Sequence, residues 1–197
     1  MSTYDQAFLR AIRERQGRTY RIPASSRLLA VQVEFGSDID VLNYALTLEH
    51  LEAAFYQMAG HYDLGTDGYG NSINGWMIAV GEHETAHVET LTQVIADLGD
   101  EPVVAAEYDF GVTDASSFLA TAAIMENLGV AAYDGAAASI QDPGLLTAAG
   151  SIVAVEARHA AYLNLLTGAS PFPEAYEAPM SPDDVLAAAA PFIVGGL

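Results

Sequence analysis

The sequence predicts an all-α protein whose centre is a four-helix bundle. Four long segments carry apolar residues at helical spacing, and stretches rich in glycine, proline or aspartate separate them. Two of these segments contain a glutamate followed three residues later by a histidine, namely Glu84 with His87 and Glu156 with His159. A spacing of three places both side chains on one face of a helix, about one turn apart.

The other two segments share a second pattern, a glutamate followed seven residues later by a tyrosine. The pairs are Glu49 with Tyr56 and Glu126 with Tyr133. Along the chain the order is therefore Glu, Glu-x-x-His, Glu, Glu-x-x-His, with one element on each helix.

The first helix follows an N-terminal arm, residues 1–36, which has no single clear period and is expected to lie over the bundle. Ser37 or Asp38 is a good N-cap for this helix, which is predicted to run to about Met58. Gly60 is placed to stop it.

The second helix is predicted over residues 72–98, with Gly99 as its stop. Residues 99–113 then form a long connection, which could span roughly 50 Å if extended. A connection of that length can cross a whole bundle, so the second and third helices are expected to lie parallel.

The third helix is predicted over 114–140 and the fourth over 145–166, which gives a bundle domain of residues 37–168. Residues 169–197 form a tail. Within it, Ser181 is a capping residue followed by proline and two acids, which predicts a short helix over 182–190 that packs on the bundle.

The two halves of the bundle resemble each other, which indicates a duplicated two-helix unit. Residues 48–51 align with residues 125–128, and Tyr56 aligns with Tyr133. Each half therefore supplies one Glu and one Glu-x-x-His to a site with pseudo-twofold symmetry.

Four carboxylates and two imidazoles that point into one bundle suit a pair of Fe or Mn ions. Zinc also accepts such ligands, but a dinuclear, oxygen-rich site favours iron or manganese. Burying the same six side chains without a cation would cost several kcal/mol for each unpaired ion. By symmetry we assign the roles as follows: Glu84 and Glu156 bridge the two metals, Glu49 and Glu126 are terminal ligands, and His87 and His159 cap one metal each.

Three further residues are candidates for the site. Tyr56 and Tyr133, the candidate catalytic residues, could each hydrogen-bond a ligand carboxylate across the bundle, and ordinary aromatic core is an equally good interpretation. Glu52 lies three residues after Glu49 and is a candidate extra metal ligand or entry residue, although the repeat places Gly129 at the matching position. Five other residues are expected at the surface: His50, His61, Glu82, His83 and Glu89.

Composition excludes several classes of site and partner. The chain has 197 residues, 51% of them hydrophobic, which suffices for one domain with a substantial core. It has no cysteine, which rules out disulfides, iron–sulfur clusters and thiolate zinc sites. The formal net charge of −19 opposes binding to nucleic acid or anionic membranes and attracts cations such as Fe²⁺.

The sequence pattern predicts neither a signal peptide nor a membrane span. No apolar run approaches the roughly 18 residues of a membrane span, and no apolar stretch follows the basic residues near the N-terminus. These observations favour the cytoplasm, and export stays open if a leader has been removed. An apolar face beyond what the core needs would allow a homodimer.

With these residues, the chain resembles the ferritin-like superfamily, and within it the ferritin-like domain proteins that include desiccation-related proteins. The resemblance covers roughly residues 37–190 and rests on the four ligand segments, including 47–56, and on the ending at 190–193. It implies a four-helix bundle with a long crossover and a buried di-iron or di-manganese site. The long arm and the proline-rich tail depart from cage ferritins, and the rubredoxin module of rubrerythrins is lacking.

The resemblance implies redox chemistry on O₂ or peroxide in many relatives, but it does not transfer a reaction to this chain. From the paired motifs we expect a di-metal protein that oxidises Fe²⁺ or reacts with O₂ or peroxide and so protects cells under oxidative or drying stress. Whether the chain is an enzyme stays open. Two other interpretations are a non-catalytic, desiccation-related structural protein that retains the bundle, and a peroxide dismutase similar to manganese catalase.

Overall fold

Four long helices form the fold in a computed structural model that describes residues 34–195. Helices α2 (Asp38–Tyr56) and α3 (Ile73–Asp97) pack together, as do α4 (Ala115–Ala136) and α5 (Pro143–Leu166). Within the described residues there is no β-strand, only two isolated bridges. The all-α bundle is therefore confirmed, whereas the predicted N-terminal arm lies almost wholly outside the described residues.

Side-chain caps fix where each long helix begins. Ser37, Ser72, Asp114 and Asp142 are the N-caps, and each side chain accepts a hydrogen bond from a backbone N–H of the first turn. The start predicted for α5 was two residues too late, because Pro143 occupies the first helical position, where its missing N–H costs nothing.

Glycines with positive φ angles and tight turns mark where the helices end. Gly99 and Gly168 lie just beyond α3 and α5 with φ angles of 88° and 84°, which glycine adopts without strain. Helix α2 ends at Tyr56, before Gly60, because the next residues form tighter turns. In these turns the N–H groups of Met58 and Ala59 donate to carbonyls three residues back.

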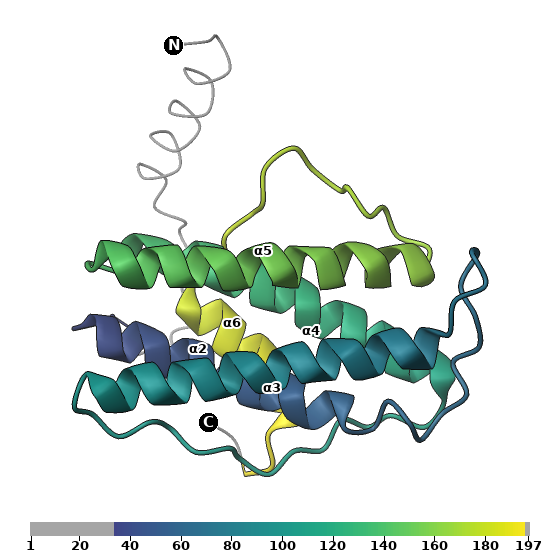
Figure 1. Cartoon of the computed structure of the whole chain (residues 1–197), viewed down its shortest axis with the longest axis horizontal. Coiled ribbons are helices and arrows are strands. Elements are labelled where there is room, and N and C mark those ends of the chain that lie inside the picture. Colours follow the sequence, from purple (N-terminus) through teal and green to yellow (C-terminus); the bar gives the residue numbers. More distant parts are fainter. Residues whose placement is uncertain (1–33, 196–197) are drawn as a thin grey trace, which may run out of the picture. The chain divides into compact units, whose positions relative to one another are not determined.

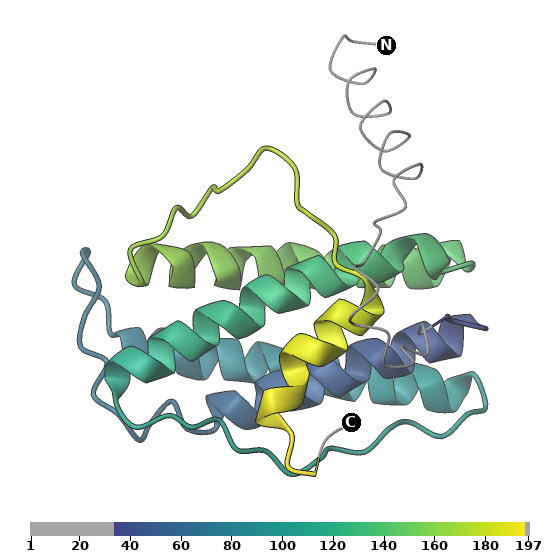
Figure 2. The same cartoon turned by 180° about the vertical axis from the view of Figure 1, so that it is seen from behind.

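Residues 98–114 connect α3 to α4 and run along the length of the bundle (Figure 1). As a result α3 and α4 point in the same direction, whereas the helices within each pair are antiparallel; the view from behind shows the same course (Figure 2). Two side chains of α2 hold this connection at Val103. The backbone N–H of Val103 donates to Oδ1 of Asn43 at 2.9 Å, and its carbonyl oxygen lies 3.1 Å from Nε2 of His50.

The tail returns to the bundle through a short helix, α6 (Pro182–Ala189), followed by a 3₁₀ turn, η3 (Ala190–Phe192). Ser181 caps α6, and α6 packs against α4. Beyond η3, the chain hydrogen-bonds the long connection: the N–H of Val194 donates to Glu107, and that of Asp109 donates to Phe192. The tail thus closes over one side of the bundle (Figure 2).

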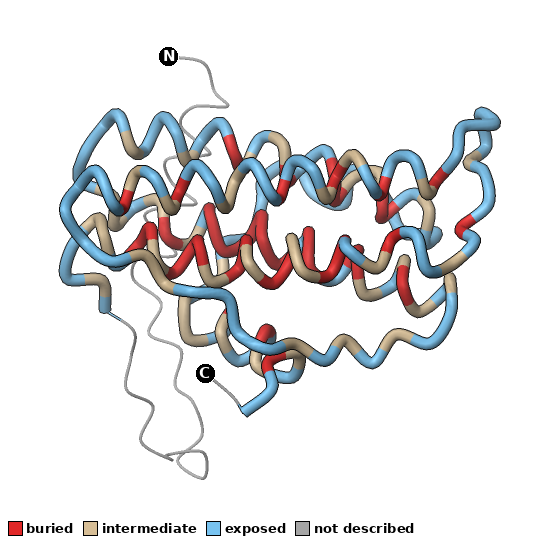
Figure 3. The backbone as a smooth tube through the Cα atoms, turned by 60° about the horizontal axis from the view of Figure 1, so that its bottom comes forward, coloured by how far each residue is buried: buried red, intermediate tan, exposed pale blue. Residues whose placement is uncertain are grey.

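Buried residues recur along each long helix, with exposed residues between them and in the connections (Figure 3). Residues Ala115–Ser139, which comprise α4 and the 3₁₀ turn η2 (Ala137–Ser139), are long and apolar enough to cross a membrane by length and composition alone. In the bundle, however, α4 packs against α2, α5 and α6, so burial in the core accounts for its apolar character.

Candidate metal centre

All four long helices direct acidic side chains into the middle of the bundle. The side chains of Glu49 on α2, Glu84 on α3, Glu126 on α4 and Glu156 on α5 are completely buried. Two histidines accompany them: His159 is buried, and His87 is nearly so. Buried carboxylates in such number need compensating positive charge or hydrogen bonds.

Three carboxylates surround the Nδ1 atom of His87. Oε2 of Glu84 lies 3.0 Å from it, Oε1 of Glu156 3.1 Å and Oε2 of Glu49 3.2 Å. Candidate ligand atoms of these four residues all lie within 4.8 Å of one another. A single N–H cannot serve three acceptors equally well, whereas a cation among them can.

A second, similar group surrounds His159. Its Nδ1 atom lies 3.1 Å from Oε1 of Glu84, 3.1 Å from Oε2 of Glu126 and 4.0 Å from Oε2 of Glu156. Candidate ligand atoms of these four residues also lie within 4.8 Å of one another. The second Glu-x-x-His thus repeats the arrangement of the first.

The two groups share Glu84 and Glu156, and each of these residues turns a different oxygen to each histidine. Oε1 of Glu84 and both oxygens of Glu156 are buried without a hydrogen-bond partner. Leaving such acceptors unsatisfied is costly, and cations would satisfy them. Two divalent cations would also balance the charge of the four carboxylates in the two groups, so the residues fit a pair of metal ions.

Two tyrosines bind the outer carboxylates across the bundle. The hydroxyl of Tyr56 on α2 donates to Oε1 of Glu126 on α4, and the hydroxyl of Tyr133 on α4 donates to Oε1 of Glu49 on α2. The exchange is reciprocal because α2 and α4 are antiparallel. A tyrosine two turns after the glutamate of its own helix therefore lies beside the glutamate of the other helix. The sequence pattern had left these hydrogen bonds and ordinary aromatic core as equally good interpretations, and the structure has the hydrogen bonds.

Glu52 is also buried among these carboxylates, with 3% of its surface exposed. It does not belong to either four-residue group. Its Oε1 atom lies 3.0 Å from the position that a Cβ atom would occupy on Gly129, and Oε2 of Glu156 lies 3.6 Å from the same position. The glycine of one half of the repeat therefore leaves room for the extra carboxylate of the other half.

Burial dominates the protonation of the carboxylates. It raises the pKa of Glu49 and of Glu156 to about 8, and it raises the pKa of Glu52 and Glu126 above the usual value. Burial also acts to raise the pKa of Glu84. There, close contacts with the two histidines outweigh burial and hold the pKa near 2.

The histidines respond in the opposite sense. Burial acts to lower the pKa of His87, but close contacts with the carboxylates of Glu156, Glu49 and Glu84 outweigh it and raise the pKa to about 12. Contacts with Glu126 and Glu84 raise the pKa of His159 to about 10 in the same way. Without a metal, these two imidazoles therefore carry positive charge.

One residue near the centre makes a contact that the sequence pattern did not predict. His83 is exposed, as expected, but its Nδ1 atom lies 2.9 Å from Nε2 of His159. The signal was its spacing of four from His87, which puts both side chains on the same side of α3. His50 was also expected at the surface and is half-buried against Val103, whereas His61, Glu82 and Glu89 are exposed.

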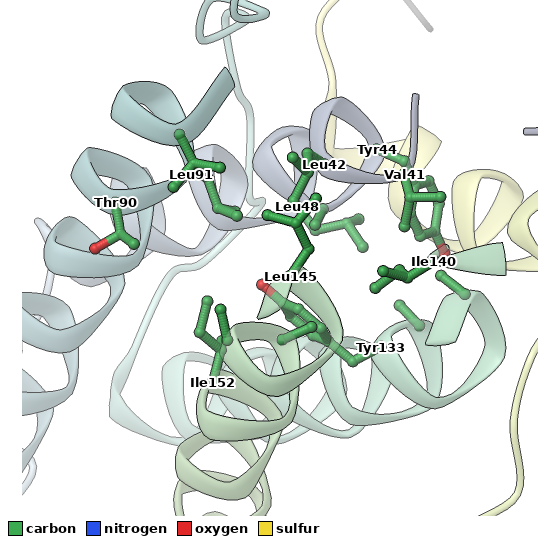
Figure 4. Close-up of a pocket in the computed structure, with 16 residues that line it drawn as sticks. Val41, Leu42, Tyr44, Leu48, Thr90, Leu91, Tyr133, Ile140, Leu145 and Ile152 are labelled. Atoms are coloured by element: carbon green, nitrogen blue, oxygen red, sulfur yellow. The ribbon is translucent and has the colours of Figure 1, made fainter. Parts of the chain in front are cut away.

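An apolar cavity of about 40 Å³ lies beside the centre, among the four long helices (Figure 4). Leu48, Leu91, Tyr133 and Ile152 are among the residues in its wall. The apolar walls place hydrocarbon around the ring of Tyr133, whose hydroxyl binds Glu49.

Comparison with known proteins agrees with this geometry. No curated protein matches the chain. The family model for the ferritin-like domain matches residues 37–169, which includes all four long helices and the whole cluster of carboxylates and histidines. The chain therefore belongs to the ferritin-like domain family.

Proposed function

We propose that the chain is a di-metal carboxylate protein that holds two iron or manganese ions and uses them for redox chemistry on O₂ or peroxide, or to oxidise Fe²⁺. In this role it would protect cells under oxidative or drying stress. The single observation that carries the proposal is the shared pair of carboxylates. Glu84 and Glu156 each turn one oxygen to each histidine, and three of these four oxygens have no hydrogen bond.

The proposed ligand roles follow from these distances. Glu84 and Glu156 would bridge the two ions, because each faces both histidines. Glu49 with His87 would complete one ion's shell, and Glu126 with His159 the other. Glu52 would be an additional ligand, or the residue that receives an incoming ion, since its carboxylate lies among the others.

A pair of such ions, when bound by these residues, would supply the redox chemistry. The protein's own groups set the conditions. Tyr56 and Tyr133 hold a proton against the outer oxygens of Glu126 and Glu49, which leaves the inner oxygens of these carboxylates free to bind cations. The apolar walls of the cavity beside Tyr133 disfavour water on that side.

Metal content per chain is the first test. Protein purified without chelator and reloaded separately with Fe²⁺ or Mn²⁺ should contain close to two ions per chain by elemental analysis. The double variant Glu84→Ala, Glu156→Ala should lose both, because it removes both shared carboxylates. The matched control is Glu82→Ala, Glu89→Ala, which removes two exposed acids of α3 and should keep both ions.

Turnover is the second test. The loaded protein should oxidise Fe²⁺ or consume peroxide, and the double variant should not. Tyr56→Phe and Tyr133→Phe should bind metal more weakly or react more slowly, because each removes a hydrogen bond to a ligand carboxylate. Rapid O₂ release from peroxide by the manganese form would favour a catalase reaction. A bundle that binds two ions but turns over neither substrate would overturn the proposed activity and leave a structural metal site.

A further inference from the structure

His83 meets His159 in a geometry suited to a hydrogen bond. The Nδ1 atom of His83 lies 2.9 Å from Nε2 of His159, and the two ring planes differ by only 12°. The ring centres are 5.2 Å apart, much farther than the two nitrogens. The rings therefore meet edge to edge and nearly in one plane, so that an N–H of one points at the lone pair of the other.

The other nitrogen of His159 decides the direction of this hydrogen bond. Its Nδ1 atom faces Glu84 and Glu126 and would use its lone pair to bind a cation. The proton of the neutral ring must then be on Nε2, which donates to Nδ1 of His83. His83 in turn carries its own proton on Nε2, and its exposed side chain gives that proton access to solvent.

The other half of the repeat lacks this partner. When Glu84 is aligned with Glu156 and His87 with His159, His83 falls opposite Val155. A valine side chain can neither accept nor donate a hydrogen bond. The two halves of the centre, similar in their carboxylates, thus differ at this position.

We propose that His83 is a positioning residue, which fixes the tautomer and orientation of His159 and joins that half of the centre to solvent through a chain of two imidazoles. The proposal rests on the proposed metal centre. It follows that the two metal positions are not equivalent: the ion at His159 depends on His83, and the ion at His87 does not. Loss of a partner that orients a metal-binding histidine typically lowers metal affinity by about 10- to 100-fold.

The test is Mn²⁺ binding by the full chain and by His83→Val, which installs the residue found in the other half. We expect one of the two binding steps to weaken by about 10- to 100-fold and the other to stay within about twofold. His83→Asn retains an acceptor close to the position of Nδ1 and should recover most of the lost affinity. If His83 contributed only packing, the asparagine and valine variants would behave alike.

A matched control and a metal-free measurement separate this proposal from the proposed function. His61→Val replaces another exposed histidine and should leave both binding steps unchanged. In the metal-free protein with ¹⁵N-labelled histidine, a scalar coupling across the hydrogen bond should connect Nε2 of His159 with Nδ1 of His83.

The outcomes are distinct. Two unchanged binding steps in His83→Val would overturn the role of His83 and leave the metal centre intact. Absence of the ¹⁵N coupling would overturn the hydrogen bond whatever the metal does. A wild-type chain that binds no Mn²⁺ and no Fe²⁺ would overturn the metal centre, and the role of His83 with it.

Discussion

At the scale of single residues, the centre is nearly symmetric in its candidate ligands and asymmetric in the residues that surround them. Each half supplies one Glu, one Glu-x-x-His and one tyrosine that donates to the opposite carboxylate. The exceptions are Glu52, which faces Gly129, and His83, which the repeat aligns with Val155. The two halves therefore match at the candidate ligands and differ at the positions next to them.

The contact between Gly129 and Glu52 gives a prediction. In Gly129→Ala the new methyl group would stand 3.0 Å from Oε1 of Glu52, so the carboxylate must move. We expect the free energy of unfolding to fall by about 1–2 kcal/mol, the range typical of overpacking. In a Glu52→Ala background the same change should instead stabilise by about 0.5–1 kcal/mol, because alanine favours the helix over glycine. Urea unfolding of the four proteins in this cycle measures both values. The same penalty in both backgrounds would contradict the contact.

At the scale of elements, α4 organises the bundle. It packs against α2, α5 and α6, and it carries Glu126 and Tyr133 on the side that faces the centre. On its other side, α4 contacts the tail, where the N–H of Met180 donates to the carbonyl of Ala131 at 3.1 Å. A Cβ atom on Gly135 would collide with the carbonyl oxygen of Met180. Glycine at this position lets the backbone of the tail lie directly on the helix.

Replacement by alanine should consequently change the stability of the protein in opposite directions at two helical glycines. Gly135→Ala should destabilise by about 1–3 kcal/mol, because backbone of the tail cannot yield as a side chain can. Gly150→Ala is the matched control within α5. Its Cβ would meet nothing within 4 Å, so we expect stabilisation by about 0.5–1 kcal/mol. Thermal unfolding by circular dichroism measures both, and limited proteolysis should cut the tail of Gly135→Ala faster. Stabilisation of Gly135→Ala would show that the tail does not pack on α4 in this way.

At the scale of the whole molecule, the dominant feature is negative charge. The chain carries a formal net charge of −19, and its basic residues are all arginine. On top of this general repulsion, the core holds five buried carboxylates with only two imidazoles among them. Proteins of high net charge lose stability through self-repulsion, and bound cations relieve it. The metal-free bundle should therefore be sensitive to pH in a predictable direction.

The metal-free protein should lose stability as pH rises from about 5 to 9. Burial raises the pKa of Glu49 and Glu156 from 4.5 to about 8, so the folded chain keeps protons that the unfolded chain releases. The pKa of His87 is raised from 6.5 to about 12, and that of His159 from 6.5 to about 10. The contribution of the two histidines to stability is therefore lost as the pH rises above about 6.5. Glu84, whose pKa is lowered to about 2, opposes this trend only below about pH 4.5.

Bound metal ions should reverse that trend, because they take the place of the protons. Between about pH 5.5 and 8.5 the Tm of the chelator-treated protein should fall by roughly 5–10 °C. The difference in Tm between the Mn²⁺-loaded and the metal-free protein should widen over the same interval. Circular dichroism at several pH values measures both. A Tm of the metal-free protein that rises with pH would contradict the protonation of the buried carboxylates.

The sequence by itself determined the helices and the family. Apolar residues at helical spacing, capping side chains and glycine stops act within a few residues, so the local pattern indicated the class of each element. Four helices with the order Glu, Glu-x-x-His, Glu, Glu-x-x-His have few arrangements that bury the acids together. The ferritin-like resemblance was confirmed by the match over residues 37–169, whereas the desiccation-related branch stays a prediction.

Only the tertiary structure decided how the side chains of different helices meet. It showed that Glu84 and Glu156 each face both histidines, and that Tyr56 and Tyr133 exchange partners across the bundle. It also showed that His83, although exposed, contacts His159. The physical reason is that spacing along one helix fixes the face on which a residue lies, whereas the rotation and direction of neighbouring helices decide what that face meets.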